Sequence, residues 1–258
     1  MKKTLTILTI FLTLTLHAQE ASVPAKCHGL FSINDSIRVR FSPGNLQYCP
    51  STRLWRFAAT QDEIIGWDEK STLPHYKGWI DLFGWGTALN PTQYSENAAD
   101  YAFTDWGRFC ALPTNGGKMW RTMTMDEWTH LLAKRKNARR LYAVAYVNRR
   151  YGLILLPDDW KCPKGVYIKT GPKEENANSY TEEKWALLEA SGAVFLPSGG
   201  KRVGINLQGP KNACRYWTSS PSAKKGGEAL YLFLDPYFPQ GRSLPKSAGI
   251  SVRLVQEM

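Results

Sequence analysis

The chain has 258 residues, 43% of them hydrophobic, and carries 33 Lys and Arg against 22 Asp and Glu, a formal net charge of +11. This length excludes a fold too small to bury a core, and it allows one large domain or two small ones. The positive balance favours polyanionic partners, such as acidic glycans or nucleic acid, but it carries no information about fold.

The N-terminus has the layout of a secretory signal peptide. Lys2 and Lys3 precede an apolar run from Leu5 to Leu16, and the small residue Ala18 follows it. The run is shorter than the roughly 20 apolar residues of a membrane span, and no later segment is long and apolar enough to span either. We expect export with cleavage near Ala18, a final location in the periplasm, on the cell surface or outside the cell, and no nucleic-acid partner.

The first part of the mature chain predicts short strands followed by a long irregular stretch. Ile37, Val39 and Phe41 alternate with polar residues, which is the period of a half-buried strand. The turn residues 43–45 lead into further short strands at 46–48 and 55–57. Residues 61–117 show little periodicity but are rich in Gly, Asp, Asn and Trp. We expect aromatic side chains to organise this stretch, because structureless loops of such length are unusual.

Two helices are predicted. Thr124 and Glu127 form the pattern of a capping box, followed by Trp128 and Leu131 on one helix face, with basic residues 134–136 in the last turn. The second helix covers 181–190, with acidic residues in its first turn and a glycine stop after it.

The remaining elements are predicted strands and loops. A hairpin is expected from 141 to 157 around the turn 148–150, and a buried strand at 193–197. Short strands are expected at 216–219, 229–234 and 250–255. The segments 221–228 and 235–248 between them are rich in Pro, Gly, Ser and Lys and are expected to be loops. The pattern predicts a single α+β domain.

The ionisable residues give few signs of catalysis or of metal binding. Five scattered cysteines show no C-x-x-C pair, so one or two disulfides and at least one remaining thiol are expected after export. Asp158 and Asp159 are adjacent carboxylates. They are interpreted as capping a turn, with a structural calcium ion as the alternative.

The densest positive charge lies after the first predicted helix and at the hairpin turn. It is interpreted as a solvated helix end, and alternatively as a patch that binds an acidic glycan or lipopolysaccharide. Its members are Lys134, Arg135, Lys136, Arg139, Arg140, Arg149 and Arg150.

Several segments in order resemble one known family: "FSPGNLQY", "WRFA", "GWIDLFGWGT", "WRTMTMDEW", "GLILLPDDW", "LEASGAVFLPSGGKR", "RYWTSS" and "GISVRLV". The set is similar to an exported bacterial C-type lectin-like domain family, related to the formylglycine-generating enzyme (sulfatase-modifying factor) fold and to the variable proteins of diversity-generating retroelements. After the expected signal peptide at 1–18 and a short linker at 19–30, the resemblance implies one C-type lectin-like domain at 31–258. That α+β domain would have two main helices packed on short twisted antiparallel strands with long loops.

The resemblance favours binding over catalysis. The formylglycine-generating enzymes use a pair of cysteines near the C-terminal end, whereas Cys214 is the only cysteine in the last ninety residues here. The calcium-dependent sugar motifs of C-type lectins do not occur. We therefore expect no catalytic residue, no cofactor and no metal site apart from the calcium alternative at Asp158.

In the retroelement-diversified relatives, loops that flank the W-[ST]-S-[ST] segment contact the ligand, and the segment itself is scaffold. This places Trp217, Ser219 and Ser220 in the scaffold. The candidate ligand-binding residues are then Asn206, Gln208, Lys211, Asn212, Arg215, Ser222, Lys224, Lys225, Asp235, Tyr237 and Arg242. The expected function is recognition of a surface glycan or protein, or of an acidic polymer. A formylglycine-generating-enzyme-like oxidoreductase and a structural component of the cell envelope are the alternatives.

Overall fold

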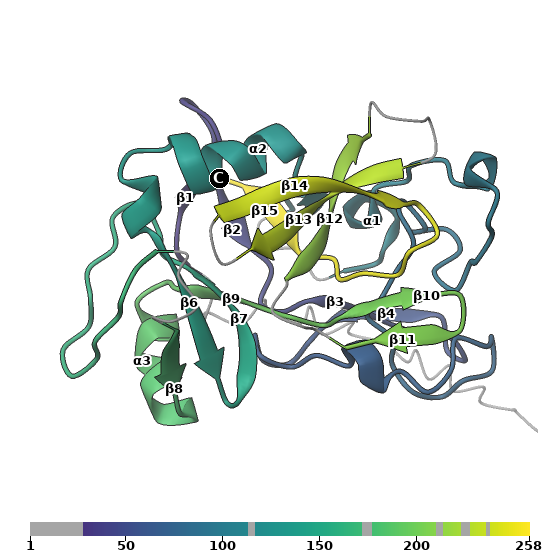
Figure 1. Ribbon diagram of the computed structural model, residues 1–258, viewed down its shortest axis with the longest axis horizontal. Helices are drawn as coiled ribbons and strands as arrows, with labels where there is room; N and C mark the ends of the chain where they lie inside the picture. The colour runs from purple at the N-terminus through teal and green to yellow at the C-terminus, as the bar shows by residue number, and fades with distance from the viewer. Residues whose placement is uncertain (1–27, 113–116, 172–176, 210–213, 223–227, 236–237) are drawn as a thin grey trace, which may run out of the picture.

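The computed structural model describes residues 28–112, 117–171, 177–209, 214–222, 228–235 and 238–258. The predicted signal peptide and most of the linker lie outside these residues. Within the described ranges, no helix combines the length and the hydrophobicity needed to cross a membrane. The architecture is α+β with mostly short strands and few helices, as predicted (Figure 1).

One sheet joins the two ends of the described chain. Its order is β1-β2-β15-β5, and Phe41 of β2 faces Val255 of β15 in an antiparallel pair. The expected strand at 250–255 is shorter at its start, because Ile250 and Ser251 form only isolated bridges. The bounds are β1 (Phe31–Ser32), β2 (Arg38–Phe41), β5 (Arg121–Thr122) and β15 (Leu254–Glu257).

A second sheet has the order β8-β6-β7-β9 and contains the predicted hairpin. The pairs β6–β7 and β7–β9 are antiparallel, but β6 and β8 are parallel, which differs from the purely antiparallel sheet implied by the resemblance. Helix α3 (Glu182–Ala190) packs Trp185 and Leu188 against one face of this sheet (Figure 1). The strands are β6 (Tyr142–Val147), β7 (Arg150–Leu155), β8 (Asn178–Tyr180) and β9 (Val194–Pro197).

The C-terminal part adds a sheet of order β12-β13-β14. The prediction of a loop at 235–248 is wrong, because β14 pairs with β13 along eight residue pairs. Pro239 and Pro245 are tolerated there, since an edge strand does not need every backbone N–H in a ladder. The strands are β12 (Arg215–Pro221), β13 (Glu228–Asp235) and β14 (Phe238–Pro245).

Two hairpins and several short helical turns complete the fold. The hairpins pair β3 (Leu46–Cys49) with β4 (Leu54–Phe57) and β10 (Lys201–Val203) with β11 (Asn206–Gln208). The short turns are η1 (Gly66–Asp68), η2 (Ala98–Asp100), α1 (Trp106–Phe109) and η4 (Ala138–Arg140).

The first predicted helix begins where the sequence places it. Thr124 caps α2 (Met125–Thr129), and the reciprocal bond from Glu127 completes the capping box. The helix continues as a π-helical turn, η3 (His130–Lys134). Helix α2 contacts strands β12 and β13, so its position is tied to the C-terminal sheet (Figure 1).

Aromatic side chains organise the long irregular stretch, as predicted. Phe83, Trp85, Trp106 and Trp120 belong to one hydrophobic cluster that also contains Trp217 of β12. The cluster packs the irregular segments against the C-terminal sheet. In this region aromatic packing, rather than hydrogen bonding between strands, fixes the position of the backbone.

A buried polar cluster joins four of the segments that carry the family resemblance. The Tyr216 hydroxyl oxygen lies 2.9 Å from Pro197 O and 3.2 Å from Asn45 Oδ1, so two acceptors share its single proton. The fully buried Arg253 donates to Gln61 Oε1 at 2.9 Å. Tyr216 and Gln61 have their partners within the core, although Asn45 Nδ2 has none among the described residues, so the cluster serves mainly to hold the fold together.

Candidate functional site

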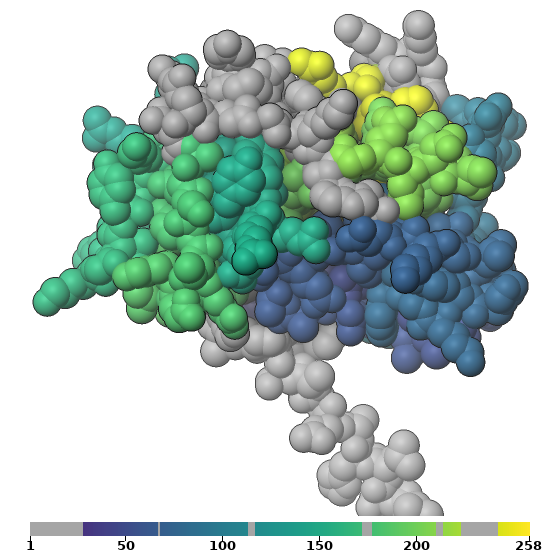
Figure 2. Space-filling view, turned by 60° about the horizontal axis from the view of Figure 1, so that its bottom comes forward, coloured from purple at the N-terminus to yellow at the C-terminus, as the bar shows by residue number. Residues whose placement is uncertain are grey.

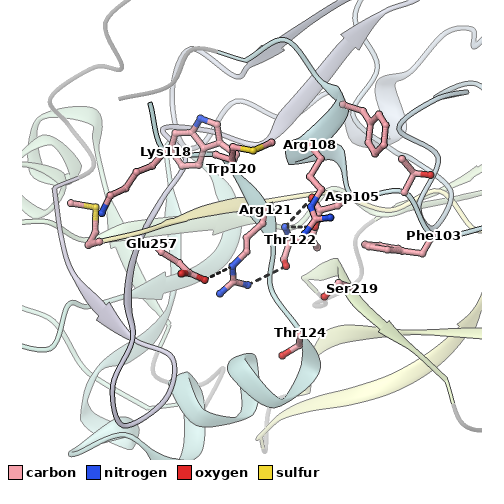
Figure 3. Close-up of a pocket in the computed structure, with 14 residues that line it drawn as sticks. Phe103, Asp105, Arg108, Lys118, Trp120, Arg121, Thr122, Thr124, Ser219 and Glu257 are labelled. Atoms are coloured by element: carbon pink, nitrogen blue, oxygen red, sulfur yellow. Dashed lines mark hydrogen bonds and ion pairs between the residues drawn. The ribbon is translucent and has the colours of Figure 1, made fainter. Parts of the chain in front are cut away.

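A hollow of about 880 Å³ lies between α1, β5 and the end of β12 (Figure 3). Asp105 shapes its wall. This carboxylate caps α1 by accepting from Gly107 N at 2.9 Å, and it accepts from Thr122 N of β5 at 3.0 Å. Burial raises the pKa of Asp105, although these backbone bonds oppose the shift. Asp105 therefore acts as a structural clamp between α1 and β5.

The sequence Asp105-Trp106-Gly107 explains how close α1 comes to β5. A Cβ atom added at Gly107 would lie 1.9 Å from the backbone oxygen of Trp120, so only glycine fits. This contact places the exposed residues after Gly107 beside the residues that precede β5, and together they form the rim of the hollow.

An ion-pair network forms the floor. Arg121 makes a bidentate pair with Glu127 at 2.9 and 2.7 Å. Its Nε also donates to Glu257 at 2.9 Å (Figure 3). Two carboxylates thus surround one guanidinium, and Arg121 has little capacity left for an anionic ligand.

The rim combines exposed apolar and cationic side chains. Phe109 is 56% exposed and Met119 59%, and both line the hollow, so the rim has an apolar surface that faces solvent. Arg108 and Lys118 are also exposed. Within the described part of the chain neither forms an ion pair, although Arg108 is near enough to Asp105 to lower its pKa. The rim therefore offers two positive charges beside an apolar surface.

The scaffold segment of β12 borders the hollow. Trp217 Nε1 donates to Phe83 O at 2.6 Å, and Trp85 Nε1 donates to Thr218 O at 2.9 Å. Ser219 N donates to Met123 O at 2.9 Å, and Ser219 itself lines the hollow. These hydrogen bonds fix β12 against Phe83, Trp85 and Met123.

The candidate ligand-binding residues do not gather at one place. Asn206 and Gln208 are exposed on the separate β10–β11 hairpin. Arg215 begins β12 and is half-buried, whereas Ser222 follows the far end of that strand, roughly 20 Å away at about 3.3 Å per residue. Arg242 is exposed on β14, where it faces Tyr231.

Of the other candidates, Asp235 lies at the end of β13, and its side chain is not described. The rest lie outside the described residues, namely Lys211, Asn212, Lys224, Lys225 and Tyr237. Ser222 contacts Ser243 of β14 through the two hydroxyl oxygens, which are 2.8 Å apart.

Sequence reasoning missed Arg108, Phe109, Lys118 and Met119. The only local signal was the Asp-Trp-Gly motif at 105–107, which the structure explains as a helix cap followed by a glycine contact. The meeting of this turn with β5 is a tertiary relationship between residues distant in sequence, and no periodic pattern encodes it.

The predicted basic cluster is divided. Arg135 is buried, and its Nη1 lies 2.8 Å from Asp158 Oδ1. Arg139 and Arg140 precede β6, whereas Arg149 and Arg150 follow it, so the strand separates the two pairs.

Asp158 has partners of its own. Besides Arg135, it accepts bonds from the Ser32 backbone amide at 2.8 Å and the Ser32 hydroxyl at 2.7 Å. The nearby guanidinium opposes a second cation, so the geometry favours the interpretation of Asp158 as a structural acceptor over the calcium alternative.

Cys214 lies in the core. Its side chain is fully buried, its Sγ donates to Leu196 O at 3.2 Å, and burial raises the pKa of the thiol to about 12. A buried, protonated thiol is a poor nucleophile. Cys49, Cys110 and Cys162 are likewise free thiols, and Cys27 lies outside the described residues.

Comparison of the chain with protein-family models, curated proteins and solved structures finds no significant match.

Proposed function

We propose that the chain is an exported, non-enzymatic binding protein on a C-type lectin-like scaffold, and that it recognises an acidic surface glycan. The observation that carries the proposal is the rim of the hollow at β5, where Arg108 and Lys118 stand beside exposed Phe109 and Met119. Aromatic and thioether surfaces pack against the C–H faces of sugars, and the two cations suit carboxylates or sulfates.

The lining chemistry supports binding rather than catalysis. The described residues that line the hollow include no histidine or cysteine. Of the lining carboxylates, Asp105 caps α1 and Glu257 pairs with Arg121. Neither is placed as an acid or base facing a free nucleophile.

The proposal includes the loops that follow β12. Ser219 lines the hollow, and the candidate Ser222 comes shortly after it in the chain. A long glycan seated on Arg108 and Lys118 would extend over this segment. A protein ligand is less favoured, because the mixed polar and apolar lining of a concave hollow suits a chain of sugars better than a flat apolar partner surface.

The test is binding of the mature chain to immobilised polygalacturonate at physiological salt. The double charge reversal R108E/K118E is expected to weaken binding about tenfold or more, since each exposed charge contributes roughly 0.5–1 kcal/mol. The matched control K161E/K164E changes the net charge equally at two exposed lysines that do not line the hollow, and it should weaken binding less than twofold.

Equal losses in the two variants would mean that only net charge matters. Failure of the unmodified chain to bind polygalacturonate would also overturn the proposed ligand class. Far-UV circular dichroism of both variants checks that they are folded.

A further inference from the structure

A second hollow, of about 840 Å³, lies at the tip of the β6–β7 hairpin beside the start of α3. It shares no lining residue with the hollow at β5. Figure 2, which turns the lower end of Figure 1 forward, shows the teal hairpin at the surface next to the green of β8 and α3. The residues that matter are Tyr146, Asn148, Arg149, Ser179, Glu182 and Glu183.

Tyr146 supplies an aromatic wall of the hollow. Tyr146 of β6 faces Tyr151 of β7, with ring centroids 5.3 Å apart at an interplanar angle of 59°. On its other side Tyr146 pairs with Ser179 of β8. The same sheet face carries Tyr142 and Leu153 into the hydrophobic core, but Tyr146 remains 38% exposed. The side chains on this face of the sheet therefore continue from the core to the surface, where Tyr146 presents its ring to solvent.

The backbone of the hairpin turn is strained, and this strain indicates a role for the side chain of Arg149. Asn148 and Arg149 have φ angles of 48° and 66°, the left-handed region required by a tight hairpin turn. Asn-Gly is the favoured pair for such a turn, and a side chain like that of arginine costs roughly 1 kcal/mol there. Glycine would relieve this strain, so the exposed Arg149 has a cost that the fold itself does not require.

The turn is fixed in position by its neighbours. The backbone amide of Asn148 donates to Tyr180 O at 3.1 Å, and its Nδ2 donates to Asp62 Oδ2 at 3.0 Å. These two bonds hold Arg149 next to the first turn of α3, where Glu182 and Glu183 are exposed.

The polar groups around the aromatic wall are both donors and acceptors. Arg149 donates, the carboxylates of Glu182 and Glu183 accept, and the Ser179 hydroxyl does both. A pyranose has an apolar C–H face and hydroxyls that donate and accept, which matches this arrangement. One positive and two negative side chains do not suit a polyanion.

We propose that this hollow binds an uncharged hexopyranose unit, stacked on Tyr146 and hydrogen-bonded by Arg149 and by Glu182 or Glu183. The site is separate from the cationic hollow at β5, and the inference does not depend on the function proposed for that hollow.

Saturation-transfer NMR tests the proposal with methyl glycosides of glucose, galactose and mannose, N-acetylglucosamine, and glucuronate as the charged member. At least one uncharged sugar should receive saturation from the unmodified chain. Tyr146→Ala and Arg149→Gly should each lower that signal at least fivefold. Tyr94→Ala, which removes another exposed tyrosine (44% exposed), should leave it unchanged.

Arg149→Gly separates binding from folding. Because glycine relieves the strained φ, this variant should unfold at a temperature equal to or above that of the unmodified chain while it loses the sugar. Absence of transfer to every uncharged sugar would overturn the proposal. So would an unchanged signal in Tyr146→Ala and Arg149→Gly. R108E/K118E should keep this signal, which distinguishes failure of this site from failure of the hollow at β5.

Discussion

The Nε atom of Arg202 lies 3.3 Å from the Oε2 atom of Glu69, and both side chains are buried. The Oε1 atom of Glu69 accepts from the backbone amides of Asp81 and Leu82 at 2.8 and 2.7 Å. Asp81 in turn accepts from two further backbone amides in the same irregular stretch, both at 2.7 Å. Two buried carboxylates therefore fix this stretch internally and attach it to β10.

The two buried carboxylates, Glu69 and Asp81, predict that the protein is more stable at mildly acidic pH than at neutral pH. Burial, together with the nearby Asp81, outweighs Arg202 and raises the pKa of Glu69 to about 7, and burial raises the pKa of Asp81 to about 6. In this range the folded state binds protons that the unfolded state has released. The free energy of unfolding should rise as pH falls from about 8 to 5, by roughly 1.4 kcal/mol per pH unit for each such proton. Urea unfolding across this range measures the slope.

Glu69→Gln is the matched variant for this prediction. It keeps the size of the side chain and removes its titration, so the slope of unfolding free energy against pH above about 6 should fall by roughly two-thirds or more, since Asp81 is mostly ionised there. An unchanged slope would show that Glu69 is not the group that takes up the proton.

The elements that the sequence predicts correctly are those with local signals. The capping box at Thr124 and the alternation of apolar residues in β2 act over a few residues, so they are visible without tertiary information. Strand β14 lacks such a signal, because its prolines and glycine favour a loop locally. Its pairing with β13 overrides that preference.

The candidate site was less predictable than the fold. Arg108 and Lys118 are separated in sequence and meet only through the contact between Gly107 and Trp120. Such juxtapositions follow from how loops pack, which single-sequence patterns do not contain.

Asp158→Ala should destabilise the protein by roughly 2 kcal/mol, because it leaves the buried guanidinium of Arg135 without its ionic partner. The cost is below that of a fully buried pair, since Asp158 itself is partly exposed. Asp159→Ala is the matched control and should change stability by less than about 0.5 kcal/mol, because within the described residues the Asp159 side chain forms no hydrogen bond or ion pair. Thermal unfolding with a chelator tests the calcium alternative. A drop in midpoint that Asp158→Ala abolishes would favour a bound ion over the role assigned to Arg135.

Glu127→Ala should cost about 2 kcal/mol in unfolding free energy. It removes one half of the capping box, where Glu127 Oε2 accepts from Thr124 N at 2.7 Å, and it also removes the bidentate pair with Arg121. Thr124→Ala removes only the other half of the box and should cost about 1 kcal/mol. Equal losses measured by chemical denaturation would mean that the pair with Arg121 contributes nothing.

The cysteines should differ sharply in reactivity. Cys162 is exposed, whereas Cys214 is fully buried and its pKa is raised to about 12 by burial. Iodoacetamide at pH 8 should therefore modify Cys162 in the native protein within minutes, and Cys214 only after denaturation, as read by peptide mass spectrometry. Cys162→Ser should leave the native protection of Cys214 intact. Rapid native labelling of Cys214 would instead indicate an accessible thiol, and it would favour the formylglycine-generating-enzyme-like alternative over a binding protein.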